Sequence, residues 1–243
     1  RYENAPIIPI SAQHRINLDV LIKVIESTIP SPKRDQSLNP IAFIARSFDV
    51  NKPGSDIQKI VGGVLGGSLK QGMLRIGDDI EIKPGYRVEE KNQTIWKPLQ
   101  TKIVGLMTGT DKVEEVRPGG SIAILTQLDP SIVKSDNLTG SVVGLPGKLP
   151  KVWNKLVLES SLLERVVGSK DELVVEPIKV NEILMLNVNT SATVGIVNEL
   201  SKNVIKCTLK IPICAEVGSR VTISRRIGNR WRLIGYGIIK EEK

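Results

Sequence analysis

Apolar and polar residues alternate along most of this chain in short runs, which is the pattern of β-strands that bury one face. The clearest run lies within residues 60–85, and its alternating apolar positions are Leu74, Ile76, Ile80 and Ile82. Glycines interrupt this run where a strand has to turn or kink, and we interpret 77–79 and 84–85 as turns. The pattern predicts one segment of a small closed β-barrel.

Further short strands are predicted on both sides of this run, separated by turns rich in glycine and proline. In the first half of the chain we place them at 41–46, 58–65, 73–82, 97–107 and 121–127. In the second half we place them at 183–188, 194–198, 204–209, 220–224 and 231–239. The apolar positions of 152–163 fit neither the helical nor the strand period well, and 168–177 is predicted to be an exposed loop. The predicted fold is therefore mainly β, as barrels or sandwiches.

The first 35 residues follow a different pattern. Residues 5–10 are typical of a short buried strand, and Asn17 is a favourable residue for capping the helix that follows it. Apolar residues then recur at helical spacing, at Leu18, Leu21, Ile22, Ile25 and Ile29. Pro30 and Pro32 end this helix. So short a strand and helix cannot bury a core alone, so we interpret them as the edge of an α/β domain.

The chain therefore divides into three predicted blocks. Residues 1–35 are the final strand and helix of an α/β domain, with a linker at 31–37. Residues 36–148 form a first β-barrel domain, and residues 149–243 form a second.

Composition changes this picture in two ways. Aromatic residues make up only 3% of the chain, so isoleucine, valine and leucine must fill the cores. The formal net charge of +8 and the pI of about 9.5 indicate a polyanionic partner such as RNA, or simply a basic surface. No apolar run approaches the roughly 18 residues of a membrane span, so no membrane partner is expected.

Candidate catalytic and metal-binding residues are scarce. Cys207 and Cys214, with His14 as the one histidine, cannot form a four-ligand zinc site, so we expect no metal and reduced, half-buried thiols. His14 is expected to be a surface or capping residue. The motifs G-x-x-x-x-G-K-[ST], D-x-x-G and N-K-x-D are all missing from the sequence. As given, the chain should therefore not hydrolyse GTP, and no catalytic residue is predicted.

Several long motifs are more specific. They are RSFDVNKPG at 46–54, GGVLGGS at 62–68 and GMLRIGDDIEIKPG at 72–85, followed by LDP at 128–130, GSVVG at 140–144 and PGKLP at 146–150. With the stretch 217–237, these motifs resemble the gamma subunit family of the archaeal and eukaryotic initiation factor two. That family consists of translational GTPases similar to elongation factor Tu. The resemblance implies that the two barrels correspond to domains II and III of translational GTPases, and that most of the GTPase domain is lacking.

The resemblance also implies a function. With GTP, the intact protein of this family carries methionyl initiator tRNA to the small ribosomal subunit in the cytoplasm, together with alpha and beta subunits. GTP or GDP and Mg²⁺ belong to the intact protein, and none is expected to bind this piece alone. Ser11, Ala12 and Gln13 correspond to the loop that faces guanine in the complete GTPase domain.

The resemblance assigns candidate tRNA contacts to the first barrel: Arg46, Lys52, Gly105, Leu106, Met107 and Thr108. Glycine lets a base or ribose approach the backbone, and leucine or methionine offers an apolar face to a purine. The alternative is that Leu106 and Met107 belong to the barrel core. Candidate contacts with the alpha subunit are Leu128, Asp129, Pro130 and Ser131.

An arginine-rich hairpin is predicted near the end of the chain. Arg225, Arg226, Arg230 and Arg232 flank a turn at Gly228 and Asn229. Alternation places Arg230 and Arg232 on one face and Trp231 on the other. Arginines facing phosphates would bind tRNA or small-subunit ribosomal RNA, unless the hairpin is only a solvated surface.

Two alternative functions remain open. One is a free-standing RNA-binding β-barrel protein without a GTPase, which would have no reason to begin with an orphan strand and helix. The other is a related elongation factor that delivers aminoacyl-tRNA, which would lack RSFDVNKPG.

Overall fold

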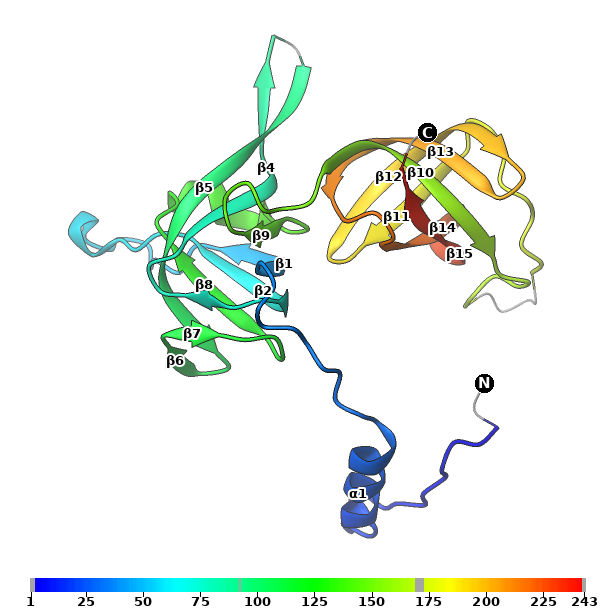
Figure 1. Cartoon of the computed structure of the whole chain (residues 1–243), viewed down its shortest axis with the longest axis horizontal. Coiled ribbons are helices and arrows are strands. Elements are labelled where there is room, and N and C mark those ends of the chain that lie inside the picture. Colours follow the sequence, from blue (N-terminus) through cyan, green and yellow to red (C-terminus); the bar gives the residue numbers. More distant parts are fainter. Residues whose placement is uncertain (1–2, 92, 169–172, 242–243) are drawn as a thin grey trace. The chain divides into compact units, whose positions relative to one another are not determined.

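The computed structural model describes residues 3–91, 93–168 and 173–241. The chain consists of two compact units, Arg1–Arg34 and Asp35–Lys243. The first unit contains one helix, α1 (Leu18–Thr28), and the strands lie in the second unit (Figure 1). Among the described residues, no helix has both the length and the apolar character to cross a membrane.

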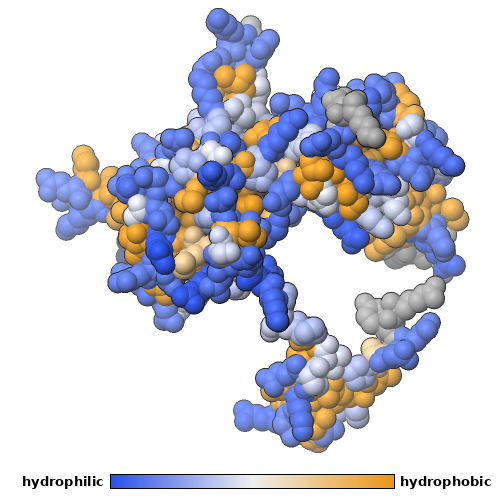
Figure 2. Space-filling model, viewed as in Figure 1, coloured by the Kyte–Doolittle hydropathy of each residue, from blue (hydrophilic) through white to orange (hydrophobic). Residues whose placement is uncertain are grey.

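The helix of the first unit begins and ends close to where the sequence predicts. Asn17 occupies the N-cap position, but its φ of 58° is left-handed and its side chain caps no helical N–H group. Instead, Nδ2 of Asn17 donates a hydrogen bond to the Pro9 carbonyl at 2.9 Å. The capping role predicted for Asn17 is therefore wrong, although its position is right. No residue of α1 is buried, and apolar side chains lie on its surface (Figure 2).

The strand predicted at residues 5–10 is wrong. These residues form no strand in the structure, and the side chain of Ile7 is 93% exposed. A strand needs a neighbouring strand to pair its backbone groups. The described residues of this unit offer only an isolated bridge between Ser11 and Ile16, so the segment 5–10 stays extended and unpaired.

The first barrel closes from six strands in the order β4-β9-β1-β2-β8-β5, with β5 pairing back to β4, within the part of the chain that the structure describes (Figure 1). Its strands are β1 (Ile41–Phe48), β2 (Val64–Gln71), β4 (Asp79–Glu90), β5 (Gln93–Thr108), β8 (Ile122–Thr126) and β9 (Val142–Gly144). Shorter elements complete it: η1 (Ile57–Lys59), β3 (Leu74–Arg75), β6 (Asp111–Val113), β7 (Glu115–Val116), α2 (Pro130–Val133) and η2 (Lys134–Asp136). The paired ends of β4 and β5 project beyond the rest of this barrel.

The core of the first barrel is aliphatic, as the scarcity of aromatic residues requires. Fully buried side chains include Ile44, Leu65, Ile80, Ile82 and Ile124. They sit at alternate positions of their strands, because successive side chains of a strand point to opposite faces. The prediction of a mainly β fold with closed barrels is confirmed.

The strand predicted at 58–65 is displaced along the chain. Residues Ile57–Lys59 form the short helix η1, and β2 begins only at Val64. Gly66 and Gly67 lie inside β2 rather than after it. A Cβ atom on Gly67 would lie 1.9 Å from the Phe43 carbonyl oxygen, so glycine here permits β1 and β2 to approach closely.

The turn predicted at residues 84–85 is also wrong, whereas the break around Gly77 is confirmed. β4 runs through residues 84–85 as an irregularity in its pairing with β5, between Ile82 and Tyr86. Gly85 has φ of +96°, and a Cβ atom there would lie 1.9 Å from the Lys97 carbonyl oxygen. Gly85 therefore marks a bulge that bends a continuous strand.

The second barrel is closed in the order β10-β13-β12-β11-β14-β15. Its strands are β10 (Val152–Leu162), β11 (Ile183–Val188), β12 (Ser191–Ser201), β13 (Val204–Cys214), β14 (Arg220–Ile227) and β15 (Arg230–Lys240). The five strands predicted here all lie within these bounds, and the undecided segment 152–163 is β10. Residues 169–172 of the predicted loop lie outside the described residues.

Both cysteines are free and buried, rather than half-buried as predicted. Burial raises the pKa of the Cys207 thiol to about 11 and that of Cys214 to about 12. The thiolate is the nucleophile, so we predict that neither cysteine reacts with iodoacetamide at pH 8 in the folded protein. Both should react once urea unfolds it. Mass spectrometry of native and unfolded samples checks this, and rapid native alkylation would contradict the buried placement.

Candidate nucleic-acid interface

An apolar groove of about 530 Å³ lies on the outer face of the first barrel. Its floor is a row of directly opposed residues across four strands: Phe48 of β1, Val64 of β2, Leu125 of β8 and Gly105 of β5. Other lining residues are Val50, Val61, Ile76, Val104, Leu106, Met107, Lys112, Val113 and Ala123. This volume lies within the range of small-molecule binding sites in proteins.

The groove exists because apolar residues occupy both faces of these strands. Leu65, Leu106 and Ile124 point into the core, while their neighbours along each strand form the outer floor. Contiguous apolar surface of this kind usually marks an interaction site. A purine base or an apolar amino-acid side chain bound in the groove would bury this apolar surface.

Gly105 leaves a hollow at the β5 end of the floor, because it has no side chain. A Cβ atom on Gly105 would lie 3.5 Å from the Leu125 Cβ, which is an ordinary contact. The hollow therefore results from the missing side chain and not from close packing of the backbone. Lys112 is the charged member of the described lining, and it places an ammonium group beside an otherwise apolar surface.

The structure separates the predicted tRNA contacts. Gly105 and Met107 line the groove, and Met107 is 36% exposed. Leu106 also borders the groove, but it is only 2% exposed and packs in the core, as the alternative interpretation of this residue holds. Thr108, Arg46 and Lys52 are exposed and lie outside the groove lining. The sequence analysis did not single out the remaining floor residues, Phe48, Val64 and Leu125. The alternation of inward and outward side chains along β1, β2 and β8 could have identified them as outward-facing.

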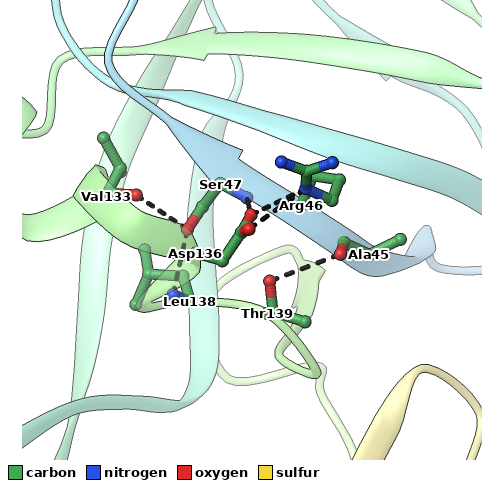
Figure 3. A network of polar contacts seen from close by, with 7 residues as sticks. All are labelled: Ala45, Arg46, Ser47, Val133, Asp136, Leu138 and Thr139. Carbon is green, nitrogen blue, oxygen red and sulfur yellow. Dashed lines mark hydrogen bonds and ion pairs between the residues drawn. The ribbon is translucent and has the colours of Figure 1, made fainter.

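Arg46 belongs to a polar network that fixes the segment 128–139 to β1 (Figure 3). Its Nε donates to the two carboxylate oxygens of Asp136 at 2.9 and 3.2 Å. The bond from Arg46, with a further bond from the Ser47 backbone N–H, lowers the pKa of Asp136. The buried Ser47 hydroxyl donates to the Val133 carbonyl and accepts from the Leu138 N–H. Arg46 therefore has a structural partner, although its side chain remains largely exposed.

The same segment holds the residues predicted to contact the alpha subunit. Leu128 is buried in the barrel core, so it offers no surface to a partner. Asp129 caps α2, because its carboxylate accepts the Ser131 N–H at 2.8 Å. Hydrogen bonds from the side chain and the backbone of Ser131 lower the pKa of Asp129. Pro130 lies in the first turn of α2. Asp129, Pro130 and Ser131 are thus the accessible part of the predicted set.

The arginine hairpin is confirmed as β14 and β15 joined at Gly228 and Asn229. Arg225 lies opposite Arg232, and Arg226 lies opposite Trp231. Successive residues of a strand point to opposite faces, so Arg232 and Trp231 do, and directly opposed residues of two strands share one face. Arg226 therefore lies on the same face of the hairpin as Trp231, and the other arginines lie on the opposite face.

Arg225 is committed to contacts inside the second barrel. Its Nε and Nη2 donate to the Glu182 carboxylate at 2.5 and 3.1 Å. Nη1 donates to the Glu176 carbonyl at 2.9 Å, and Nη2 donates to the Pro177 carbonyl at 3.1 Å. These bonds use most of the five N–H groups of a guanidinium. The arrangement gives Arg225 a structural role, which leaves little capacity for the phosphate contact that the sequence predicts.

Ser11, Ala12 and Gln13 lie in a tight surface loop of the first unit. Ser11 exchanges backbone hydrogen bonds with Ile16, and its hydroxyl accepts the His14 N–H at 3.4 Å. Across the described ranges, no group of three or more His, Cys, Asp or Glu side chains is placed to hold a metal ion.

Comparisons with known proteins identify close relatives. Residues 154–239 match the family model described as "Initiation factor eIF2 gamma, C terminal". The chain is 57% identical over 237 residues to translation initiation factor 2 subunit gamma of Methanococcus maripaludis. It is 59% identical over 239 residues to the protein of the same name from Pyrococcus furiosus. Each match covers 98% of this chain but only 58% of the relative, so the chain spans little more than half the length of these proteins.

Among solved structures, the chain resembles a bacterial selenocysteine-specific elongation factor, EF-Sec, with a TM-score of 0.71. This match covers 97% of the chain and 34% of the other chain, at 19% sequence identity. At this identity, the likeness establishes a shared fold and nothing more.

Proposed function

We propose a role in translation initiation for this chain, which over the region that it spans belongs to the family of translation initiation factor 2 gamma subunits. The observation that carries this proposal is the identity of 57% over 98% of the chain to a protein of that name. The two barrels supply binding surfaces, and no catalytic step is assigned to them.

In this proposal, the groove on the first barrel receives the aminoacylated 3′ end of methionyl initiator tRNA. The apolar floor suits the flat face of the terminal adenine and the thioether side chain of methionine. Lys112 can pair with a phosphate at the rim. Gly105 supports this placement because its hollow lets a base or ribose lie against the backbone.

The remaining partners follow from the family and are proposed for the intact protein. GTP and Mg²⁺ would bind a GTPase domain, whose guanine-facing loop would include Ser11, Ala12 and Gln13. Alpha and beta subunits would complete the factor, and it would act in the cytoplasm on the small ribosomal subunit. Of the residues predicted for the alpha subunit, the exposed Asp129 and Ser131 are the best placed to take part.

The arginine hairpin of the second barrel is proposed as a further contact with RNA. Arg226 and Arg230 are exposed and Arg232 is half-buried, so these three can approach phosphates of tRNA or ribosomal RNA. Arg225 is left out because its guanidinium holds Glu182.

The experiment that tests the groove measures how far the chain protects methionyl initiator tRNA from hydrolysis of its ester bond. We expect protection by the unchanged chain and weaker binding of uncharged tRNA. The variant Val104→Asp puts a carboxylate into the groove and should abolish protection. Its matched control is Leu200→Asp, a similarly exposed position on β12 of the second barrel. Equal protection by both variants would exclude the groove as the binding site.

A further inference from the structure

The outer face of the second barrel carries an exposed tryptophan directly opposite an exposed arginine. Trp231 of β15 pairs with Arg226 of β14, and Trp231 is 37% exposed. The inward positions of these strands are filled by Val221, Ile223 and Ile234, which are fully buried. Trp231 therefore lies on the outer face of the barrel, where part of its surface is open to solvent.

A hollow of about 450 Å³ adjoins this pair. Arg226 forms part of its wall, and Lys179, Val180 and Ile183 line it with one cation and two exposed aliphatic side chains. Other lining residues are Glu176, Asn181, Glu182 and Arg225. The surface thus combines an aromatic ring, an apolar floor and cationic groups within one region of the barrel.

The segment that forms the wall of this hollow is rigidly held. Arg225 ties its two ends to β14 through the Glu176 and Pro177 carbonyls and the Glu182 carboxylate. Asn181 donates its N–H to the Val197 carbonyl at 2.8 Å. A surface fixed in this way loses little conformational entropy when it binds a ligand.

The charges around the hollow favour an anion. Arg226 has no ion-pair partner within the described residues, and Lys179 lies 3.8 Å from Glu176 in a largely exposed, weak pair. The Arg225–Glu182 pair is neutral in sum. A guanidinium group beside an aromatic ring is typical of surfaces that bind single-stranded RNA, where bases stack and phosphates pair.

We propose that Trp231 and Arg226 form a stacking site for an unpaired RNA nucleotide, with the hollow beside Val180 and Ile183 accepting the adjacent nucleotide. This inference rests on the proposed RNA-binding role of the hairpin and names the form of RNA that it binds. A duplex would not use the indole ring, because the bases of A-form RNA are stacked inside the helix.

The test uses the full chain and a fluorescein-labelled, single-stranded RNA of six nucleotides, with binding followed by anisotropy. Trp231→Ala should weaken binding about tenfold, as expected for loss of one base stack, whereas Trp231→Phe should retain most of the affinity. Arg226→Ala should also weaken binding and reduce the slope of log K against log salt by about 0.7, while Trp231→Ala leaves this slope unchanged. Trp96→Phe is the matched control and should change nothing.

Tryptophan fluorescence gives an independent measurement. In the Trp96→Phe background, RNA should quench the emission of Trp231, since Trp153 is buried and shielded. Circular dichroism of each variant checks that the barrel is folded. Unchanged RNA affinity in Trp231→Ala and Arg226→Ala would overturn the proposal. Binding of an acidic, leucine-containing peptide in place of RNA would overturn it too and identify a protein-docking surface.

Failure of this inference can be told apart from failure of the proposed function. The hexanucleotide assay depends on Trp231, whereas ester protection of methionyl-tRNA depends on Val104 in the other barrel. If Val104→Asp abolished hexanucleotide binding and Trp231→Ala did not, the single strand would lie in the groove and the stacking site would be refuted.

Discussion

Gly105→Val is expected to weaken binding of methionyl initiator tRNA by at least about tenfold, which is the scale of losing one stacked base. Valine would fill the hollow in the groove floor, because its Cβ fits in ordinary contact with Leu125 and its methyl groups project outward. The stability of the protein without tRNA should not fall. Gly105 has no positive φ, and valine is favoured over glycine in a strand interior. The measurements are tRNA affinity and the melting temperature of the same samples.

A graded series sharpens this prediction. Gly105→Ala should give a smaller loss than valine, since alanine fills less of the hollow. Thr94→Val introduces the same residue at an exposed position of the same strand, outside the groove, and should leave affinity unchanged. If valine at position 105 lowered the melting temperature along with the affinity, the effect would be structural. Full affinity with an unchanged melting temperature would place the tRNA elsewhere.

Arg225→Ala is expected to destabilise the second barrel by about 2–4 kcal/mol. The side chains of Arg225 and Glu182 are only 17% and 18% exposed, so the truncation leaves a poorly solvated carboxylate without its partner. The Glu176 and Pro177 carbonyls also lose their donor. Urea unfolding followed by circular dichroism measures the difference in the free energy of unfolding.

The neighbouring arginine is the control for this prediction. Arg226→Ala should change the free energy of unfolding by no more than about 0.5 kcal/mol, as is usual for a surface substitution. The double variant Arg225→Ala with Glu182→Ala should recover part of the loss, because it removes the stranded charge. Equal stability of the Arg225→Ala and Arg226→Ala variants would contradict the structural role of Arg225.

Local sequence signals were sufficient where each strand buries one face. All five strands predicted in the second barrel lie within observed strands, and the hairpin at Gly228 and Asn229 is where the sequence places it. Alternation and turn residues are properties of a few neighbouring positions, so they can be read without knowledge of the fold. The long motifs likewise pointed to the initiation factor 2 gamma subunits, to which the comparisons find this chain similar.

Other assignments depended on residues far away in the sequence. Gly67 lies beyond the strand predicted at 58–65 and Gly85 belongs to a predicted turn, yet each lies inside a strand where a distant carbonyl, of Phe43 or Lys97, approaches the backbone. Leu106 and Met107 are equally apolar, and only the pairing of β5 with its neighbours decides which one faces the core. The strand predicted at 5–10 failed for the same kind of reason, since strand pairing requires a partner.

The sequence by itself determined that this chain is basic, mainly β and similar to initiation factor 2 gamma subunits, because composition, periodicity and motifs do not depend on how the strands are arranged. Only the tertiary structure decided which arginine holds a carboxylate and which meets solvent, and where an apolar groove opens on the outside of a barrel. Strand register decides which residues lie opposite each other and which face of the sheet each side chain occupies. A one-residue change of register would move each of these side chains to the opposite face.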